Sequence, residues 1–172
     1  MNTLTQLATL LRAVGSIEGR KKLQKIVHIL QEFGVPFDVR YGYHHYGPFS
    51  EELQEALQSF KHDGLIKEEP VSGSFPTSRF TATDELISVL EQVGTHEDPK
   101  WGTFATELNS KTPRELEAIS TLVYLERNTQ MPEDGQIDSE FIKLKTNLKE
   151  LLPATKQTLK QFQEKYVDLA VA

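Results

Sequence analysis

Three stretches of the N-terminal half carry apolar residues at helical spacing, and a glycine follows each of them. The stripes are Leu4, Leu7, Ala8, Leu11 and Val14; Leu23, Ile26, Val27, Leu30 and Phe33; and Phe49, Leu53, Ala56, Leu57 and Phe60. Apolar residues three and four positions apart lie on one face of an α-helix, and glycine commonly ends a helix. The sequence therefore predicts three amphipathic helices, of which the second begins near Ile17.

A β-hairpin is expected directly after the third helix. Short strands are predicted near 65–68 and 78–81, on either side of a loop rich in Pro, Gly and Ser. Thr81 and Asp84 then have the spacing of a capping box, which predicts a fourth helix. Three helices followed by a hairpin is the order of a winged helix-turn-helix domain. We therefore expect residues 1–94 to form a winged helix-turn-helix-like domain, in a mainly α fold with a small β-hairpin.

Residues 95–172 carry the pattern of an α-helical C-terminal region. After a turn-rich connection, residues 101–108 are expected to form a short helix. Thr112, Pro113 and Glu115 then form a typical helix start, in which threonine caps the helix, proline occupies its first position and glutamate completes a capping box. The second half of the chain is therefore predicted to contain helices and no strand.

Two more helices are predicted from apolar stripes around 141–151 and 159–169, separated by Pro153. A polar stretch over 128–136 predicts the loop before them. The sequence leaves open whether this C-terminal region folds separately or packs on residues 1–94 as one unit.

The composition limits the chemistry that the chain can carry. Its 172 residues include no cysteine, which excludes disulfides, thiolate nucleophiles and cysteine-based metal sites. The N-terminus lacks the pattern of a signal peptide, and no apolar run approaches the ~20 residues of a membrane span. The formal net charge of −6 does not favour nucleic acid or an anionic membrane as a partner. We expect a cytoplasmic protein with no membrane partner.

The stretch YGYHHYGPFS, residues 41–50, is the most unusual of the chain. It is expected to be mainly a structural corner, in which Gly47 and Pro48 turn an extended segment sharply into the third helix. Proline suits the first turn of a helix, because its missing N–H has no partner there. Phe49 lies on the apolar stripe of this helix and is expected to be buried beneath it.

Neither metal binding nor catalysis is predicted. His44 and His45 are adjacent, and neighbouring side chains of an extended chain point to opposite faces, so the pair is a poor chelator of one ion. Glu51 and Glu52 are also adjacent and do not share a helical face as an acid–base pair would. No nucleophile, metalloprotease, phosphate-loop or dinucleotide motif is present. We expect no catalytic, cofactor-binding or metal-binding residues and predict that the chain is not an enzyme.

One basic cluster lies at the start of the second helix, and its members are Arg20, Lys21, Lys22 and Lys25. One interpretation is a solvated helix face, whose long side chains cover apolar surface. The other is a binding site for an anion or an acidic partner. In this second interpretation, the cluster and the neighbouring His45 and Tyr46 form a partner-binding surface.

Sequence-specific DNA binding through the third helix is disfavoured. A winged helix that reads DNA lays this helix in the major groove. Its leading positions here are Glu51, Glu52 and Glu55, and residues 49–69 carry two lysines against six acidic residues. Binding to phosphates depends on cations that release counterions, which such an acidic edge opposes. The predicted wing offers little compensation, with Arg79 as its main cation.

Two motifs carry a resemblance to known families. The segment GRKKLQKIVHILQEFG, followed by YHHYGPFSEELQEALQSFKHDGLI, resembles the YwgA-like group of bacterial proteins. More distantly, the first half is similar to the Panacea domain of SocA-like antitoxins and phage-associated GepA proteins. Lys22 and Lys25 match the K-L-Q-K positions of these families. The resemblance implies protein handling, since SocA-like members act as proteolytic adaptors or antitoxins that grip a protein partner.

The function predicted from the sequence is a non-enzymatic protein-interaction module, adaptor or antitoxin-like, built on a winged helix. The alternative is a dimeric DNA-binding transcription regulator of the winged-helix class that contacts DNA by another surface. A third interpretation is an enzyme whose site the sequence does not reveal. The identity of the protein partner and the formation of a homodimer are left open.

Overall fold

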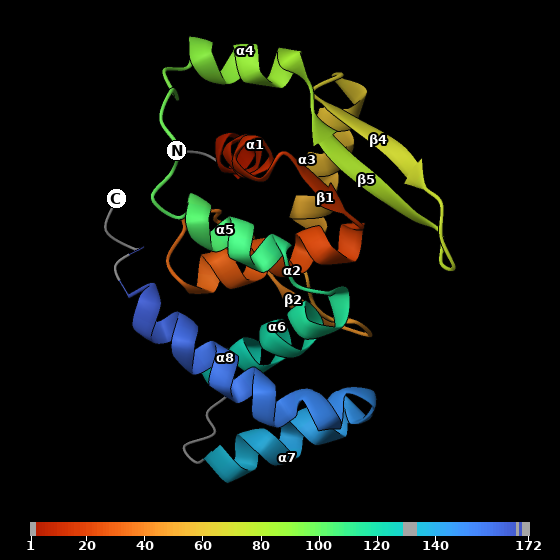
Figure 1. The fold of residues 1–172 in the computed structure, drawn as a ribbon, viewed down its shortest axis with the longest axis vertical. Helices are drawn as coiled ribbons and strands as arrows, with labels where there is room; N and C mark the ends of the chain where they lie inside the picture. The colour runs from red at the N-terminus through yellow and green to blue at the C-terminus, as the bar shows by residue number, and fades with distance from the viewer. Residues whose placement is uncertain (1–2, 129–133, 168, 170–172) are drawn as a thin grey trace.

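The computed structural model describes residues 3–128, 134–167 and 169. The described part is mainly helical with small antiparallel sheets (Figure 1). Its helices are α1 (Thr3–Val14), α2 (Arg20–Glu32), α3 (Glu51–His62), α4 (Asp84–Gln92), α5 (Gly102–Asn109), α6 (Pro113–Asn128), α7 (Asp134–Leu144) and α8 (Leu152–Lys165), with a 3-10 helix η1 (Thr146–Leu151). Its strands are β1 (Ser16–Glu18), β2 (Gly42–His44), β3 (Gly47–Phe49), β4 (Ile66–Val71) and β5 (Thr77–Ala82).

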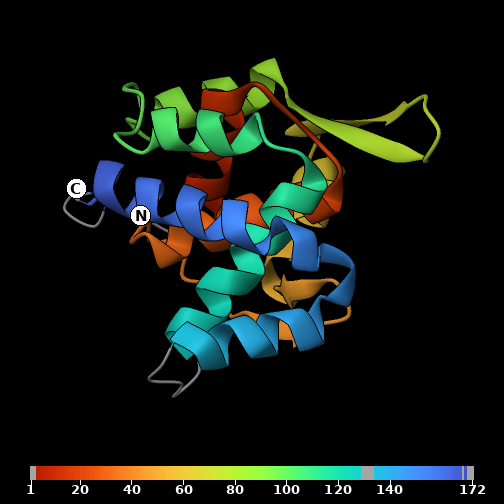
Figure 2. The same cartoon turned by 60° about the horizontal axis from the view of Figure 1, so that its bottom comes forward.

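The predicted hairpin after the third helix is confirmed as strands β4 and β5. They form a three-stranded antiparallel sheet with β1, in the order β1-β5-β4. In both views the β4–β5 hairpin projects from the body of the molecule (Figures 1 and 2). The strand β1 was not predicted, and the expected start of the second helix near Ile17 is wrong. Ile17 lies opposite Phe80, and both side chains are buried, so long-range pairing places this residue in the sheet.

A second hairpin, formed by β2 and β3, replaces the predicted entry into the third helix. Pro48 belongs to β3 and pairs with Tyr43, so its expected place in the helix is wrong. The helix starts three residues later, because the Ser50 hydroxyl accepts a hydrogen bond from the backbone N–H of Leu53 and caps α3. The cap of α4 is likewise Thr83 instead of the predicted Thr81.

In the C-terminal part the predicted helix start at Thr112 is confirmed. The Thr112 N–H donates to the Glu115 carboxylate at 2.8 Å, and the Glu115 N–H donates to the Thr112 hydroxyl at 3.2 Å, which completes the capping box. The helix predicted around 141–151 is interrupted, because α7 ends at Leu144 and the chain restarts as η1. Most of the loop predicted over 128–136 lies outside the described residues.

The helix α2 runs through the middle of the molecule. It packs against α5 and α6, while α7 and α8 pack on α6 and α4 packs on α1 (Figure 1). Buried hydrophobic residues from both halves of the chain belong to one cluster, which includes Leu23 and Ile26 of α2 and Leu122 of α6. Since α2 has contacts on several sides, its polar residues near the first two turns can also be buried. None of the described helices has the length and apolar character needed to cross a membrane.

Candidate functional site

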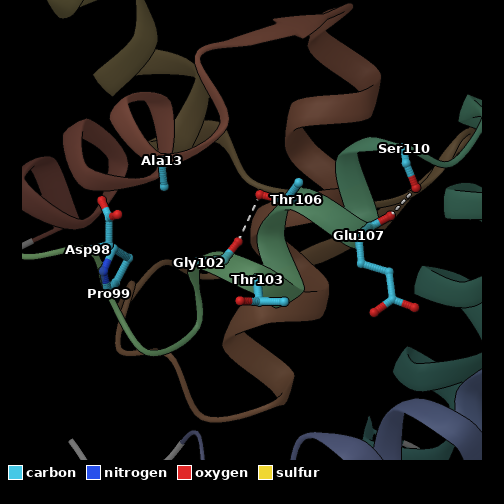
Figure 3. A pocket seen from close by; sticks show the side chains of 8 residues that line it. All are labelled: Ala13, Asp98, Pro99, Gly102, Thr103, Thr106, Glu107 and Ser110. Carbon is cyan, nitrogen blue, oxygen red and sulfur yellow. Dashed lines mark hydrogen bonds between the residues drawn. The ribbon is translucent and has the colours of Figure 1, made fainter.

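The hollow between α1 and α5 does not bring its polar side chains together around one point where they could act on a ligand. It has a volume of about 530 Å³, and its acidic side chains, Asp98 and Glu107, lie at opposite ends of the group drawn in Figure 3. The Thr106 hydroxyl donates to the Gly102 carbonyl of the same helix. The Glu107 carboxylate is engaged by the Lys165 ammonium at 2.8 Å. These groups are therefore already used within the fold.

A smaller hollow of about 370 Å³ lies between α2 and the β2–β3 hairpin, and we call it the α2–hairpin pocket. It is lined by Arg20, Lys21, Gln24, Lys25, His44, His45, Tyr46, Gly47, Phe49 and Glu51. The pocket thus brings together the side chains predicted to bind a partner, apart from Lys22, and two residues of the predicted corner.

The hairpin above the pocket has a two-residue turn, His45–Tyr46, between His44 and Gly47. Gly47 adopts a positive φ of 84°, which a residue with a side chain rarely takes. A Cβ atom at Gly47 would lie 3.1 Å from the Thr121 hydroxyl and 3.5 Å from the Lys25 ammonium. The absence of a side chain at this position therefore lets the hairpin lie directly on the polar groups of α2 and α6.

Two buried lysines support the hairpin from beneath. The Lys25 ammonium donates to the Pro48 carbonyl at 2.5 Å, and the Lys145 ammonium donates to the His45 carbonyl at 3.1 Å. Lys25 is 1% exposed and Lys145 is 3% exposed. Gln24 adds two hydrogen bonds to the backbone of Ser50, at 2.9 and 3.0 Å. The hairpin and the start of α3 are thus fixed by side chains of α2 and of the α7–η1 connection.

One carboxylate, that of Glu117, forms ion pairs with two lysines near the pocket. Glu117 of α6 accepts from Lys145 at 2.7 Å and lies 3.8 Å from the Lys21 ammonium. Lys25 forms no ion pair with a carboxylate of the described residues. Burial lowers the pKa of Lys25 to about 7; the charges of Lys145 and Lys21 act in the same direction, while Glu117 opposes the shift.

The basic residues at the start of α2 do not form the uniform exposed face that one interpretation assumed. Arg20 is half-buried and pairs with Glu68 at 3.0 Å. The Lys22 ammonium donates to the backbone carbonyl of Asn109. The expected exposure of Lys25 is wrong, because the hairpin covers this residue. Lys21 is the exposed member of the cluster.

Aromatic rings border the mouth of the pocket. The His45 ring contacts Tyr46, with 4.8 Å between ring centroids, and His44 contacts Phe49 at 5.2 Å. The Lys21 ammonium lies 3.7 Å from the centroid of the Tyr46 ring, in cation–π contact. The expected burial of Phe49 beneath α3 is wrong: the side chain lies in β3 and is half-buried. The described residues contain no group of three or more His, Asp and Glu side chains placed to hold a metal ion.

A second buried polar group lies close to the pocket on the same helix. His28 of α2 is fully buried, and its Nδ1 lies 2.9 Å from the Ser120 hydroxyl of α6. Its ring contacts Tyr41 at 4.7 Å between centroids. Burial, with the Lys25 charge as a smaller cause, lowers the pKa of His28 to about 3. This histidine is therefore neutral at physiological pH.

The sequence interpretation missed Glu117, Thr121 and Lys145. Glu117 and Thr121 lie beside the apolar stripe of α6, four residues apart and therefore on one helical face. That spacing predicts that the two polar side chains share a helical face, but it does not predict that this face is buried. No feature of the neighbouring sequence could predict the burial of Lys145, because this burial depends on the hairpin one hundred residues earlier.

The fold and the pocket define a mainly helical protein with small antiparallel sheets and a cationic pocket beneath a short hairpin. No family model matches the chain. The chain is 33% identical over 116 residues to the uncharacterized protein YwgA of Bacillus subtilis (strain 168), and the match covers 65% of this chain and 68% of that protein. The chain belongs to the YwgA family. The more distant resemblance to the Panacea domain stays a prediction.

Proposed function

We propose that the chain is a non-enzymatic protein-interaction module, adaptor or antitoxin-like, that binds a protein partner at the mouth of the α2–hairpin pocket. The observation that carries this proposal is the pairing of Tyr46 and Lys21. Tyr46 is 56% exposed and its ring lies against the Lys21 ammonium. An exposed aromatic residue beside a cation and a hollow is typical of the residues that dominate protein interfaces.

A winged-helix origin of the N-terminal part is supported by the order of its elements. The helices α1, α2 and α3 precede the β4–β5 hairpin, and the short strand β1 between α1 and α2 pairs with β5. This is the order of helices and strands that a winged helix uses. The β2–β3 hairpin lies between α2 and α3, where a helix-turn-helix motif has only a short turn. The proposed partner surface thus includes the β2–β3 hairpin, a segment that a helix-turn-helix motif does not contain.

DNA binding by a winged-helix regulator is the second candidate function, and the projecting β4–β5 hairpin favours it (Figure 2). The charges oppose it. Glu51, Glu52 and Glu55 are exposed along the start of α3. The Arg79 guanidinium of β5 is paired with Glu18 at 2.5 Å. Few cations of the described surface are therefore free to meet phosphates at this end of the molecule, and we place this function second.

Affinity capture from the native cell with matched surface variants tests the proposed function. Lys21→Glu and Tyr46→Ala should each lose the proteins that the unaltered chain retains. The charge-matched control is Lys160→Glu on the exposed face of α8, and the aromatic control is Phe75→Ala, at a residue that is 85% exposed between β4 and β5. The proposal is wrong if the controls reduce capture as much as the pocket variants do, or if all four variants capture the same proteins.

A further inference from the structure

A third hollow, of about 540 Å³, lies between α1, residues 34–36 after α2 and the connection from α4 to α5, and we call it the Gln6 pocket. Its wall includes Gln6 and Thr9 of α1 and Trp101 at the start of α5. Among the described residues it shares none with the α2–hairpin pocket. Sites that hold small molecules typically have volumes of ~300–1,000 Å³. The Gln6 pocket is therefore large enough for a ligand of its own.

Two nearly buried side chains of this pocket carry polar groups that the fold does not use. Gln6 and Trp101 are each 5% exposed. Within the described part of the chain, neither the Gln6 amide nor the Trp101 indole N–H takes part in a hydrogen bond. Buried polar groups are normally paired, so two unpaired groups on the wall of one hollow point to a partner outside the fold.

Both unpaired groups are accessible from the pocket. Neither of them is among the unpaired polar atoms of the described residues that are sealed from water. The space that they reach is therefore the hollow that both side chains line. The mouth of this hollow includes the exposed residues Pro36, His96 and Lys100, so that a molecule can enter from solvent.

The groups on the wall define the hydrogen bonds that a ligand must make. The Trp101 N–H only donates and so requires an acceptor, whereas the Gln6 amide presents a donor and an acceptor side by side. Thr9 lies three residues from Gln6 and on the same helical face. Its hydroxyl donates to the Thr5 carbonyl at 2.8 Å, which leaves its oxygen free to accept. A planar edge with an acceptor next to a donor matches the amide with two bonds, as a nucleobase does for glutamine.

The charges at the pocket favour an uncharged ligand. The titratable residues of its described wall, His96, Glu97, Asp98 and Lys100, are all exposed at the mouth and carry both signs. The nearby Arg12 guanidinium is bonded to the backbone carbonyls of Thr95 and Glu97. An ion that entered would lose its hydration without meeting a buried counter-charge among the described residues.

We propose that the Gln6 pocket binds an uncharged nucleobase. Gln6 bonds to an edge of the base that carries an acceptor beside a donor, and Trp101 donates to a further acceptor. This site goes beyond the proposed function, because it requires no protein partner and lies apart from the α2–hairpin pocket. Capture with the Lys21 and Tyr46 variants tests the other pocket, so either proposal can fail alone.

Trp101 is the single tryptophan of the chain, so its indole N–H signal reports on this pocket directly. The full chain, labelled with ¹⁵N, is titrated with adenosine, cytidine, inosine and uridine, and with ribose as the control that lacks a base. We expect saturable shifts of the indole N–H and of the Gln6 side-chain amide with at least one nucleoside and none with ribose. The corresponding 5′-monophosphate should bind no more tightly than the nucleoside.

Gln6→Met keeps much of the size of the side chain and removes its amide. The nucleoside should bind this variant about tenfold or more weakly, since two hydrogen bonds are lost. Because the amide has no partner in the fold, urea unfolding should show that the variant is at least as stable as the unaltered chain. The control is Gln157→Met at an exposed position of α8, which should leave binding unchanged.

Each outcome decides the assignment. It is overturned if no nucleoside gives saturable shifts, or if ribose gives the same shifts. A 5′-monophosphate that binds more tightly than its nucleoside would show that the site recognises phosphate and would also overturn it. Equal binding by Gln6→Met and the unaltered chain would mean that the amide does not contact the base. If Gln6→Met is much less stable or does not fold, the amide is used within the fold and the proposal is wrong.

Discussion

The Lys25 ammonium lies 2.5 Å from the Pro48 carbonyl oxygen, so a buried cation of α2 holds the second strand of the β2–β3 hairpin. This contact joins the K-L-Q-K segment to the Gly-Pro corner, which lie more than twenty residues apart in the sequence. The same contact places the hairpin turn, with His45 and Tyr46, beside Lys21. The position of the proposed partner surface therefore depends on a group inside the fold.

The charge of Lys25 should make stability depend on pH. Its pKa is about 7 in the folded chain and 10.5 in the unfolded chain. Between these values the unfolded chain holds a proton that the folded chain has released, so the free energy of unfolding rises with pH, by up to about 1.4 kcal/mol per pH unit. Below pH 7 both states hold the proton and this dependence ends.

Urea unfolding of the unaltered chain and of Lys25→Met at pH 7, 8 and 9 measures this effect. The difference in free energy of unfolding between the two should shift with pH in favour of the unaltered chain, because other groups cancel in the comparison. Parallel pH profiles would show that Lys25 keeps an ordinary affinity for its proton.

His28 should make the fold sensitive to acid. Its pKa is about 3 in the folded chain and 6.5 in the unfolded chain, so the unfolded chain takes up a proton as the pH falls through this window. Stability from this group is present above pH 6.5 and is lost below it, at up to about 1.4 kcal/mol per pH unit. Between pH 7 and pH 5, His28→Gln should lose less free energy of unfolding than the unaltered chain. The exposed His62→Gln is the control, and an identical loss in all three chains would contradict the expectation.

Two phenylalanines should differ in their contribution to stability. Phe104 of α5 is fully buried between Phe33 and Tyr166, and Phe104→Ala should cost ~3–5 kcal/mol. Phe49 is half-buried on the hairpin, and Phe49→Ala should cost about 1–2 kcal/mol, because part of its ring already contacts water. Denaturant unfolding compares them. Equal costs would mean that the hairpin packs as tightly as the core.

Binding to random duplex DNA should be weak and should depend little on salt. The exposed start of α3 is acidic and Arg79 is paired, so few cations can displace counterions. Fluorescence anisotropy with a labelled duplex at two salt concentrations measures this. Tight binding that falls steeply as salt rises would make the regulator the first choice of function.

The helices could be predicted from the sequence because their signals are local. Apolar stripes and the glycines that follow them predicted the bounds of α1 and α3 closely. The capping box of Thr112 and Glu115 predicted the start of α6. The strand β1 could not be predicted in this way. Its three residues are stabilised by pairing with β5 more than sixty residues later, and such pairing leaves little trace in a short segment.

Several residues that line the α2–hairpin pocket could be singled out from the sequence, but their arrangement could not. Lys25 belongs to a basic run that suggests an exposed face, yet this residue is covered by a hairpin whose second strand the sequence interpretation placed at the start of a helix. The choice between helix and strand at Pro48 depended on Ser50, which caps α3 in place of the proline turn. The buried partners Lys145 and Glu117 come from the second half of the chain, where long-range packing alone determines their burial.

Site-specific photocrosslinking in the native cell tests the central claim most directly. The photoreactive residue p-benzoylphenylalanine is placed at His45, at the mouth of the α2–hairpin pocket, and in a second chain at Lys160 on α8. The claim predicts a discrete crosslinked protein from position 45 that is absent from position 160 and is lost when Tyr46→Ala or Lys21→Glu is added. Crosslinks that are the same from both positions, or that persist in these variants, would contradict the claim that this surface binds the partner.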